Sequence, residues 1–139
     1  MAVPRPPAFI SRQVVDGRYY FGELTPPPDT PVAVACAGCE DCAADYRMVR
    51  RYFRYHALEF IDNGQWRLRM AERTVVLGPG SVFAYGPAGG YRLEALGGSP
   101  LRKYFVDFSG RQAGQLMRRH GIPGDRPVSL HQPARMREV

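Results

Sequence analysis

Between residues 56 and 108 the chain alternates short runs of apolar, β-branched and aromatic residues with turns that contain glycine or proline. Six such runs occur: His56–Asp62, Gln65–Met70, Thr74–Leu77, Ser81–Tyr85, Tyr91–Leu96 and Leu101–Phe108. Short strands at this spacing are typical of a sandwich or a barrel, and helices need longer runs of a different period. The sequence therefore predicts an all-β fold.

The turns between these runs have their own signals. The pair Asn63-Gly64 follows the first run and is a strong indicator of a tight hairpin. The segment Gly78-Pro79-Gly80 indicates a second tight turn. Between these turns Trp66, Leu68 and Met70 alternate with polar residues, so we expect these three side chains to share one buried face.

The ends of the chain differ from this middle part. Residues 1–31 begin and end in proline-rich stretches, and we interpret them as an N-terminal arm with one strand at Val14–Leu24. Residues 32–110 form the predicted barrel. In residues 111–139 the period changes to that of a helix at Arg111–His120, with Leu116 and Met117 as apolar contacts and Gly121 as its stop.

Composition narrows the class of protein. No stretch is long and apolar enough for a membrane span, and the N-terminus does not resemble a signal peptide. Three cysteines are too few for a disulfide framework, so we expect a cytoplasmic protein with reduced thiols. The net charge is +6, and the residues from Arg111 onward carry six arginines against two acids. The predicted barrel is thus nearly balanced in charge, which argues against DNA binding by this chain alone.

Three segments stand out in order along the chain: ALEFIDNGQWRL, LGPGSVFAYGPAGGYRLEA and LRKYFVDFSG. In order and spacing they resemble the ligand-binding, dimerisation domain of AraC-family transcription regulators, and the tail resembles the helical segment that follows the barrel there. The resemblance implies a cupin-like jelly-roll barrel, a small-molecule effector with a sugar as one candidate, and a homodimer. It also implies that DNA is bound only through a C-terminal domain, which the residues after the barrel are too few to supply.

Cupins often bind a metal through histidines and a glutamate in two motifs. The resemblance places Ala57 at the glutamate position of the first motif and Tyr91 at the histidine position of the second. Alanine cannot coordinate a metal and tyrosine is a rare ligand, so we expect no barrel metal and no metal-dependent catalysis. No pair of residues typical of nucleophilic catalysis can be assigned either.

Side chains alternate along a strand, so the inward position of Ala57 implies that Glu59 also points inward. The same alternation brings further polar and aromatic side chains into the interior. The predicted ligand-binding residues are Arg51, Glu59, Tyr91, Lys103 and Phe105, with Arg50 as the alternative to Arg51 and with Ile61, Leu93 and Asp107 as inward neighbours. The alternative interpretation is an ordinary barrel core, in which Glu59 forms an ion pair with Lys103 or Arg51.

The cysteines Cys36, Cys39 and Cys42 lie within seven residues, in what the sequence indicates is a turn. Three thiolates at this spacing could hold a structural zinc ion, with His56 as the nearest fourth ligand. The alternative is three loop thiols without a special role.

Three functions remain open from the sequence. The first is an effector-sensing and dimerisation domain of a transcription regulator, the second is a small cupin enzyme, and the third is a structural dimer module without a ligand. The two absent metal ligands count against the second.

Overall fold

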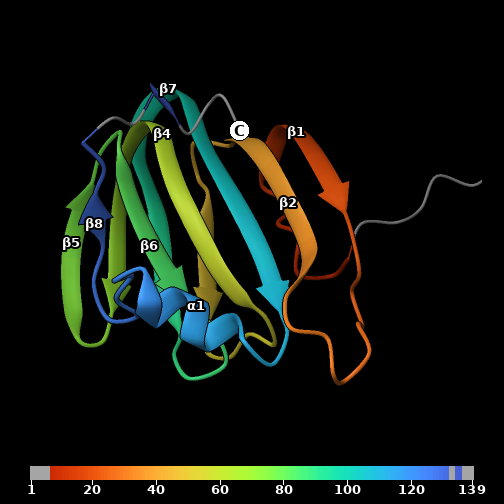
Figure 1. The fold of residues 1–139 in the computed structure, drawn as a ribbon. Coiled ribbons are helices and arrows are strands. Elements are labelled where there is room, and N and C mark those ends of the chain that lie inside the picture. Colours follow the sequence, from red (N-terminus) through yellow and green to blue (C-terminus); the bar gives the residue numbers. More distant parts are fainter. Residues whose placement is uncertain (1–6, 132–133, 136–139) are drawn as a thin grey trace, which may run out of the picture.

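The computed structural model describes residues 7–131 and 134–135. It is built from one antiparallel sheet that curves around an enclosed interior, with a single short helix packed on the outside (Figure 1). This arrangement confirms the predicted all-β fold. The elements are β1 (Val14–Phe21), β2 (Ala33–Cys42), β3 (Arg47–Arg50), β4 (His56–Met70), β5 (Arg73–Leu77), β6 (Ser81–Tyr85), β7 (Tyr91–Ser109), α1 (Ala113–Arg119) and β8 (Val128–Ser129).

Two long strands, β4 and β7, form the centre of the sheet. The strand order is β1-β2-β7-β4-β6-β8, while β3 pairs with the first part of β7 and β5 pairs with the last part of β4. The N-terminal strand β1 pairs with β2 along its whole length, so it belongs to the same sheet. Because β7 contacts β2, β3 and β4, its inward side chains meet residues from three other strands.

The hairpin predicted at Asn63-Gly64 is wrong. The chain does not reverse there, and β4 continues through this pair to Met70. Gly64 has a φ of +99°, and it faces an irregular stretch of β7 that includes Gly97 and Gly98. The register places Asn63 opposite Arg102 and Gln65 opposite Gly97, so β7 contains extra residues at this point. The glycines therefore bend a continuous strand pair, as β-bulges do, and the two runs predicted within residues 91–108 are one strand.

The predicted turn at Gly78–Gly80 is confirmed. The amide of Ser81 donates a hydrogen bond to the carbonyl of Gly78 at 3.2 Å, and Gly80 has a φ of +94°. The alternation of Trp66, Leu68 and Met70 is confirmed as well, since all three are buried in the main core. Each such side chain contributes about 1.5–3 kcal/mol by leaving water.

The C-terminal segment begins with α1, within the helix predicted at Arg111–His120, and Gly121 ends it with a φ of +66°. The helix packs through Ala113 and Met117, whereas Leu116 is 38% exposed and was wrongly expected as a main contact. The segment is not helical throughout, because Val128–Ser129 pairs with β6. Residues 132–133 and 136–139 lie outside the described residues. No helix among the described residues is long and apolar enough to cross a membrane.

Candidate ligand-binding site

A small polar cavity lies inside the barrel, with a free volume of about 20 Å³. That volume accommodates about one water molecule. Side chains from five strands line it, and the N-terminal residues Phe9, Ile10 and Ser11 close it on one side. The remaining lining residues are Glu40, Tyr46, Met48, Arg50, Glu59, Tyr85, Tyr91, Lys103, Phe105 and Asp107.

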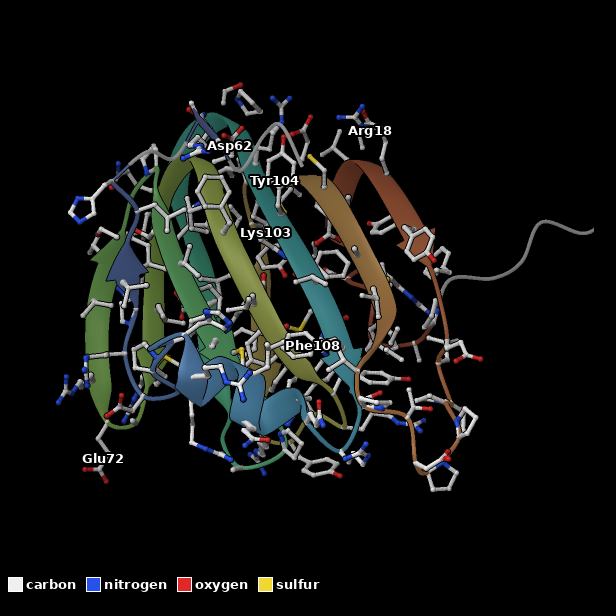
Figure 2. The ribbon with its side chains drawn as sticks, in the orientation of Figure 1. Arg18, Asp62, Glu72, Lys103, Tyr104 and Phe108 are labelled. Atoms are coloured by element: carbon white, nitrogen blue, oxygen red, sulfur yellow. The ribbon has the colours of Figure 1, made fainter. Side chains whose placement is uncertain are left out.

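Lys103 is the centre of the charged network. It lies on β7 (Figure 2), and its ammonium is 2.8 Å from Glu40 Oε1 and 2.7 Å from Glu59 Oε1. All three side chains are almost completely buried. The oxygen Glu59 Oε1 has no well-aligned hydrogen bond, but the ammonium at 2.7 Å compensates its charge. One buried cation therefore holds two carboxylates that come from β2 and β4.

This pairing favours the charged forms of Lys103 and Glu59. Burial by itself lowers the pKa of Lys103, but the nearby Glu59 and Glu40 carboxylates outweigh burial and raise that pKa well above its usual value. Burial raises the pKa of Glu59, whereas Lys103 lowers it, and the net direction is downward. The interior consequently contains permanent charges, which are costly to bury without such partners.

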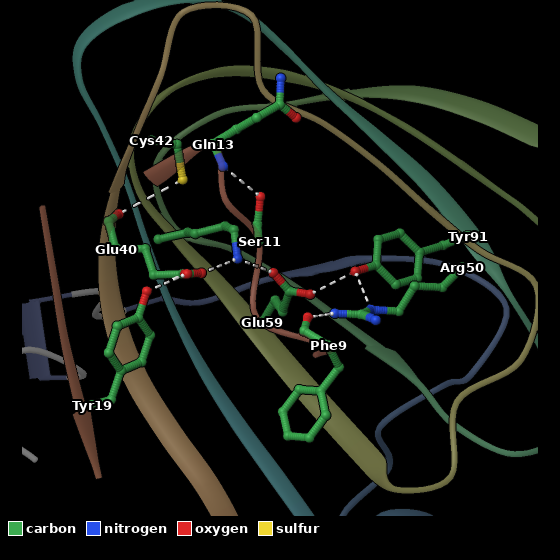
Figure 3. Close-up of polar contacts among 10 residues, drawn as sticks. Phe9, Ser11, Gln13, Tyr19, Glu40, Cys42, Arg50, Glu59 and Tyr91 are labelled. Atoms are coloured by element: carbon green, nitrogen blue, oxygen red, sulfur yellow. Dashed lines mark hydrogen bonds and ion pairs between the residues drawn. The ribbon is translucent and has the colours of Figure 1, made fainter. Parts of the chain in front are cut away.

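Two phenols complete the network (Figure 3). Tyr19 donates a hydrogen bond to Glu40 Oε2 at 2.8 Å, and Tyr91 donates one to Glu59 Oε2 at 3.1 Å. The guanidinium of Arg50 donates to the Tyr91 hydroxyl at 3.3 Å and also to the carbonyl of Phe9. Arg50 is thus the link between the barrel interior and the N-terminal residues.

Asp107 is the exception in this network. It is 2% exposed, and its Oδ1 atom has no hydrogen-bond partner among the described residues. Burial raises its pKa to about 7, and the charge of Glu59 adds to that effect. An unpartnered carboxylate in a closed interior costs free energy.

Aromatic rings form the apolar walls of the cavity. The rings of Tyr85 and Tyr91 lie 4.3 Å apart between centroids, and Phe83 packs against Tyr91 edge-on at 5.4 Å. Phe105 is 9% exposed and lies 6.2 Å from the ring of Tyr19. Rings of this kind offer faces on which the C–H groups of a ligand can pack.

The structure brings together four of the five predicted ligand-binding residues: Glu59, Tyr91, Lys103 and Phe105 all line the cavity. The fifth, Arg51, is exposed and lies beyond the end of β3. The prediction that Arg51 lines the cavity is wrong, and its alternative Arg50 does so. Arg50 lies directly opposite Tyr91 across β3 and β7, and its side chain points inward.

Sequence reasoning missed four lining residues with polar side chains, which are Ser11, Glu40, Tyr46 and Tyr85. Glu40 was passed over because its segment was interpreted as a turn, and it alternates with Cys36 and Cys42 along an actual strand. Tyr46 and Tyr85 were not selected, although Tyr85 belongs to a correctly predicted run. Alternation along residues 36–42 was the one signal that could have identified Glu40.

The interior does not fit a resident metal ion. Ala57 faces Asp107 across β4 and β7, and Tyr91 hydrogen-bonds Glu59, so neither cupin ligand position supplies a donor of the usual type. The Lys103 ammonium already lies between the two closest carboxylates. Among the described residues, no group of three His, Cys, Asp or Glu side chains is arranged to hold a metal ion.

The cysteines do not form the predicted turn. Cys36, Cys39 and Cys42 all lie in β2, where neighbouring residues point to opposite faces. Cys36 and Cys42 are buried in the interior, about 20 Å apart at the usual rise of ~3.3 Å per residue, and Cys39 lies opposite Tyr104 on the outer face. His56 stacks on Phe108 instead, with ring centroids 5.9 Å apart. This geometry gives the zinc hypothesis no support.

A curved antiparallel sheet that encloses a charged cavity, with a flanking helix on its outer face, is the architecture of a cupin barrel. The chain belongs to the family of AraC-like ligand binding domains, whose model matches residues 34–138. This match confirms the resemblance found in the sequence.

Solved structures show the same fold at low sequence identity. The protein YhaK from Escherichia coli is 15% identical with a TM-score of 0.60, over 86% of this chain and 53% of that one. The Cnp3 cupin domain of Schizosaccharomyces pombe is 17% identical with a TM-score of 0.50, over 77% and 72%. Salicylate 1,2-dioxygenase from Pseudoaminobacter salicylatoxidans is 14% identical with a TM-score of 0.51, over 91% and 31%. This chain thus spans about half of YhaK and a third of the dioxygenase. No curated protein matches it in sequence.

Proposed function

We propose that this chain is the effector-sensing domain of a transcription regulator, and that it binds a small polar molecule in the barrel cavity without transforming it. The observation that carries the proposal is the buried network around Lys103, in which cations, carboxylates and phenols converge on one cavity. A convergent polar set in a largely apolar enclosure is the usual form of a small-molecule site.

The network supports ligand binding better than a purely structural role. Replacing a buried ion pair with apolar residues of similar volume is often neutral or stabilising, so stability alone does not favour three carboxylates in a barrel interior. One of them, Asp107, also has an oxygen without a partner among the described residues. A ligand that donates a hydrogen bond to it would remove that cost.

A carbohydrate is one effector class that suits these side chains. Phe105 and Tyr85 offer ring faces to C–H groups, while Glu59 and Tyr91 offer hydrogen bonds to hydroxyls. The free volume is smaller than any sugar, so a sugar must displace the residues that close the cavity. The segment Phe9–Ser11 lines one side of the cavity and precedes β1, so it is the part that we expect a sugar to displace.

The enzyme alternative has less support. The dioxygenase likeness concerns the fold alone, since its sequence identity is 14%. In this chain Lys103 fills the space between the carboxylates that could have met a metal. Homodimerisation, and DNA binding by a separate domain, are parts of the same proposal and rest on family membership.

Thermal shift against a panel of neutral sugars and polyols tests the proposal. We expect at least one compound to raise the melting temperature of the wild type, and to do so less in Tyr91→Phe, which loses the hydroxyl that joins Glu59 to Arg50. The matched control is Tyr20→Phe, since Tyr20 is 63% exposed and should respond like the wild type. An effect of equal size in both variants would contradict binding in this cavity.

A further inference from the structure

One buried carboxyl group in the cavity has no ion-pair partner among the residues that the structure describes. Asp107 is 2% exposed and lines the cavity, and its Oδ1 atom accepts no hydrogen bond from any described residue. The ion pairs within 4.0 Å among the described residues do not include Asp107. We propose that Asp107 is the recognition point for a protonated amine, so that the effector of this cavity is a small ammonium compound. This inference rests on the proposed function.

The balance of interior charges points to a cation. Three carboxylates line the cavity, from Glu40, Glu59 and Asp107, against two cations, Lys103 and Arg50. Lys103 is held between Glu40 and Glu59, and Arg50 is held by a phenol and a backbone carbonyl. Neither cation forms an ion pair with Asp107, so an additional positive charge beside its carboxyl group would stabilise the ionised form.

The surroundings of Asp107 leave room for a small head group. Its neighbours in register are Cys36 on one side and Ala57 on the other, and both have short side chains. The free volume of about 20 Å³ matches one water-sized group. The rings of Tyr85 and Phe105 line the same cavity, and aromatic faces attract ammonium groups.

Other ligand groups fit this position less well. An anion would add a fourth negative charge to the interior. A neutral hydroxyl would supply the hydrogen bond but would leave the carboxylate charge uncompensated. An amino sugar would satisfy both the carbohydrate assignment and the charge requirement.

The charge state of Asp107 depends on groups from every strand packed around it. Burial and the nearby Glu59 carboxylate raise its pKa to about 7, while Arg50 and Lys103 oppose that rise. The groups in question are Cys36 and Glu40 on β2, Arg50 on β3, Glu59 on β4, Tyr85 on β6 and Lys103 on β7 itself. A bound ammonium would favour the ionised form of Asp107 and would therefore lower its pKa.

The first test uses methylammonium, which carries the proposed head group and little else. A ligand of two heavy atoms cannot bind much more tightly than on the order of 10 mM. Methylammonium chloride is therefore titrated to 100 mM or so while the carboxyl ¹³C signal of Asp107 is recorded, with Asp107→Asn used to assign it. We expect a saturable shift and a lower pKa for Asp107.

The controls separate recognition from ionic strength. Methanol has nearly the same size without the charge, and sodium chloride has the charge without the hydrogen-bond donor; neither should give a saturable shift. A wild-type Asp107 signal that responds to methylammonium no more than to sodium chloride would overturn the proposal. Because this readout is on the wild type, it does not depend on the folding of a variant.

A second test distinguishes this proposal from the proposed function. Ethanolamine and ethylene glycol differ only by an ammonium in place of a hydroxyl. We expect ethanolamine to raise the melting temperature of the wild type more than ethylene glycol, and to lose that advantage in Asp107→Asn. If neutral compounds stabilise the wild type and Asp107→Asn equally while amines add nothing, the amine assignment fails and the sensing function stands.

Discussion

Glu40 and Lys103 lie directly opposite one another on β2 and β7, and their charged groups meet 2.8 Å apart in the barrel interior. They are 63 residues apart in the chain. The pair is a cross-strand contact between two buried strands, so its geometry is fixed by the register of the sheet. Four predictions follow from the network around this pair and from the groups beside it.

Removing the ammonium of Lys103 should destabilise the folded protein strongly. Lys103→Met keeps most of the side-chain volume but leaves Glu40 and Glu59 facing each other without compensation. Removing one partner of a buried ionic group costs about 3–5 kcal/mol, and we expect a loss of unfolding free energy of that size from denaturant midpoints. Arg102→Met is the matched control, because Arg102 immediately precedes Lys103 on β7 and its closest ion pair, with Asp41, is near the surface. The control should lose about 1 kcal/mol or less.

Phe105 and Glu59 should respond differently to substitution. Phe105→Ala removes a buried ring and should cost about 3–5 kcal/mol of unfolding free energy. Glu59→Gln keeps the volume and leaves Lys103 with Glu40, so it should cost less than Lys103→Met. Phe105→Leu is the control for volume. Equal losses in Glu59→Gln and Lys103→Met would mean that Glu40 does not hold the ammonium by itself.

Stability should depend on the protonation of Asp107. Its pKa is about 7 in the folded protein, above the ordinary value of 3.8, so the folded state binds more protons than the unfolded state between these limits. Unfolding free energy therefore falls as pH rises through this window. Compared with Asp107→Asn, the wild type should lose about 2–3 kcal/mol between pH 5 and pH 8. Chemical denaturation of both proteins at several pH values checks this, and parallel curves would contradict it.

The three thiols should react in two stages. Burial raises the pKa of Cys36 and of Cys42 to about 12, so neither forms a reactive thiolate at pH 8 in the folded protein. Cys39 is half-buried on the outer face and should react first with a thiol reagent. Cys39→Ser should abolish the fast stage. If a chelator instead accelerates all three reactions, the thiols hold a metal and the strand geometry of β2 is not that of the native protein.

The fold was largely predictable, because strand periodicity is a local signal. Runs such as Ser81–Tyr85 and the turn before it were placed correctly from a few residues. The hairpin at Asn63-Gly64 was predicted wrongly for a physical reason. Glycine permits a positive φ in a turn and in a bulge alike, and only the partner strand decides between them. Here the partner, at Gly97 and Gly98, is irregular too.

The candidate site was predictable only where family resemblance fixed the direction of side chains. Glu59, Tyr91, Lys103 and Phe105 were placed correctly because alternation extends one known position along a strand. Glu40 was missed because three cysteines nearby suggested a metal-binding turn. The lack of a partner at Asp107 could not have been foreseen, since it depends on where charges from several strands lie in space.

The helix α1 lies on the outer face of the sheet, where its residues Ala113 and Met117 share a hydrophobic cluster against which Leu58 and Val106 pack. Leu58 and Val106 are the immediate chain neighbours of Glu59 and Phe105, which point to the other side and line the cavity. One wall of the cavity and the surface that the helix covers are thus the two faces of the same strands, β4 and β7. A displacement of this backbone would therefore change the cavity wall and the surface under the helix together.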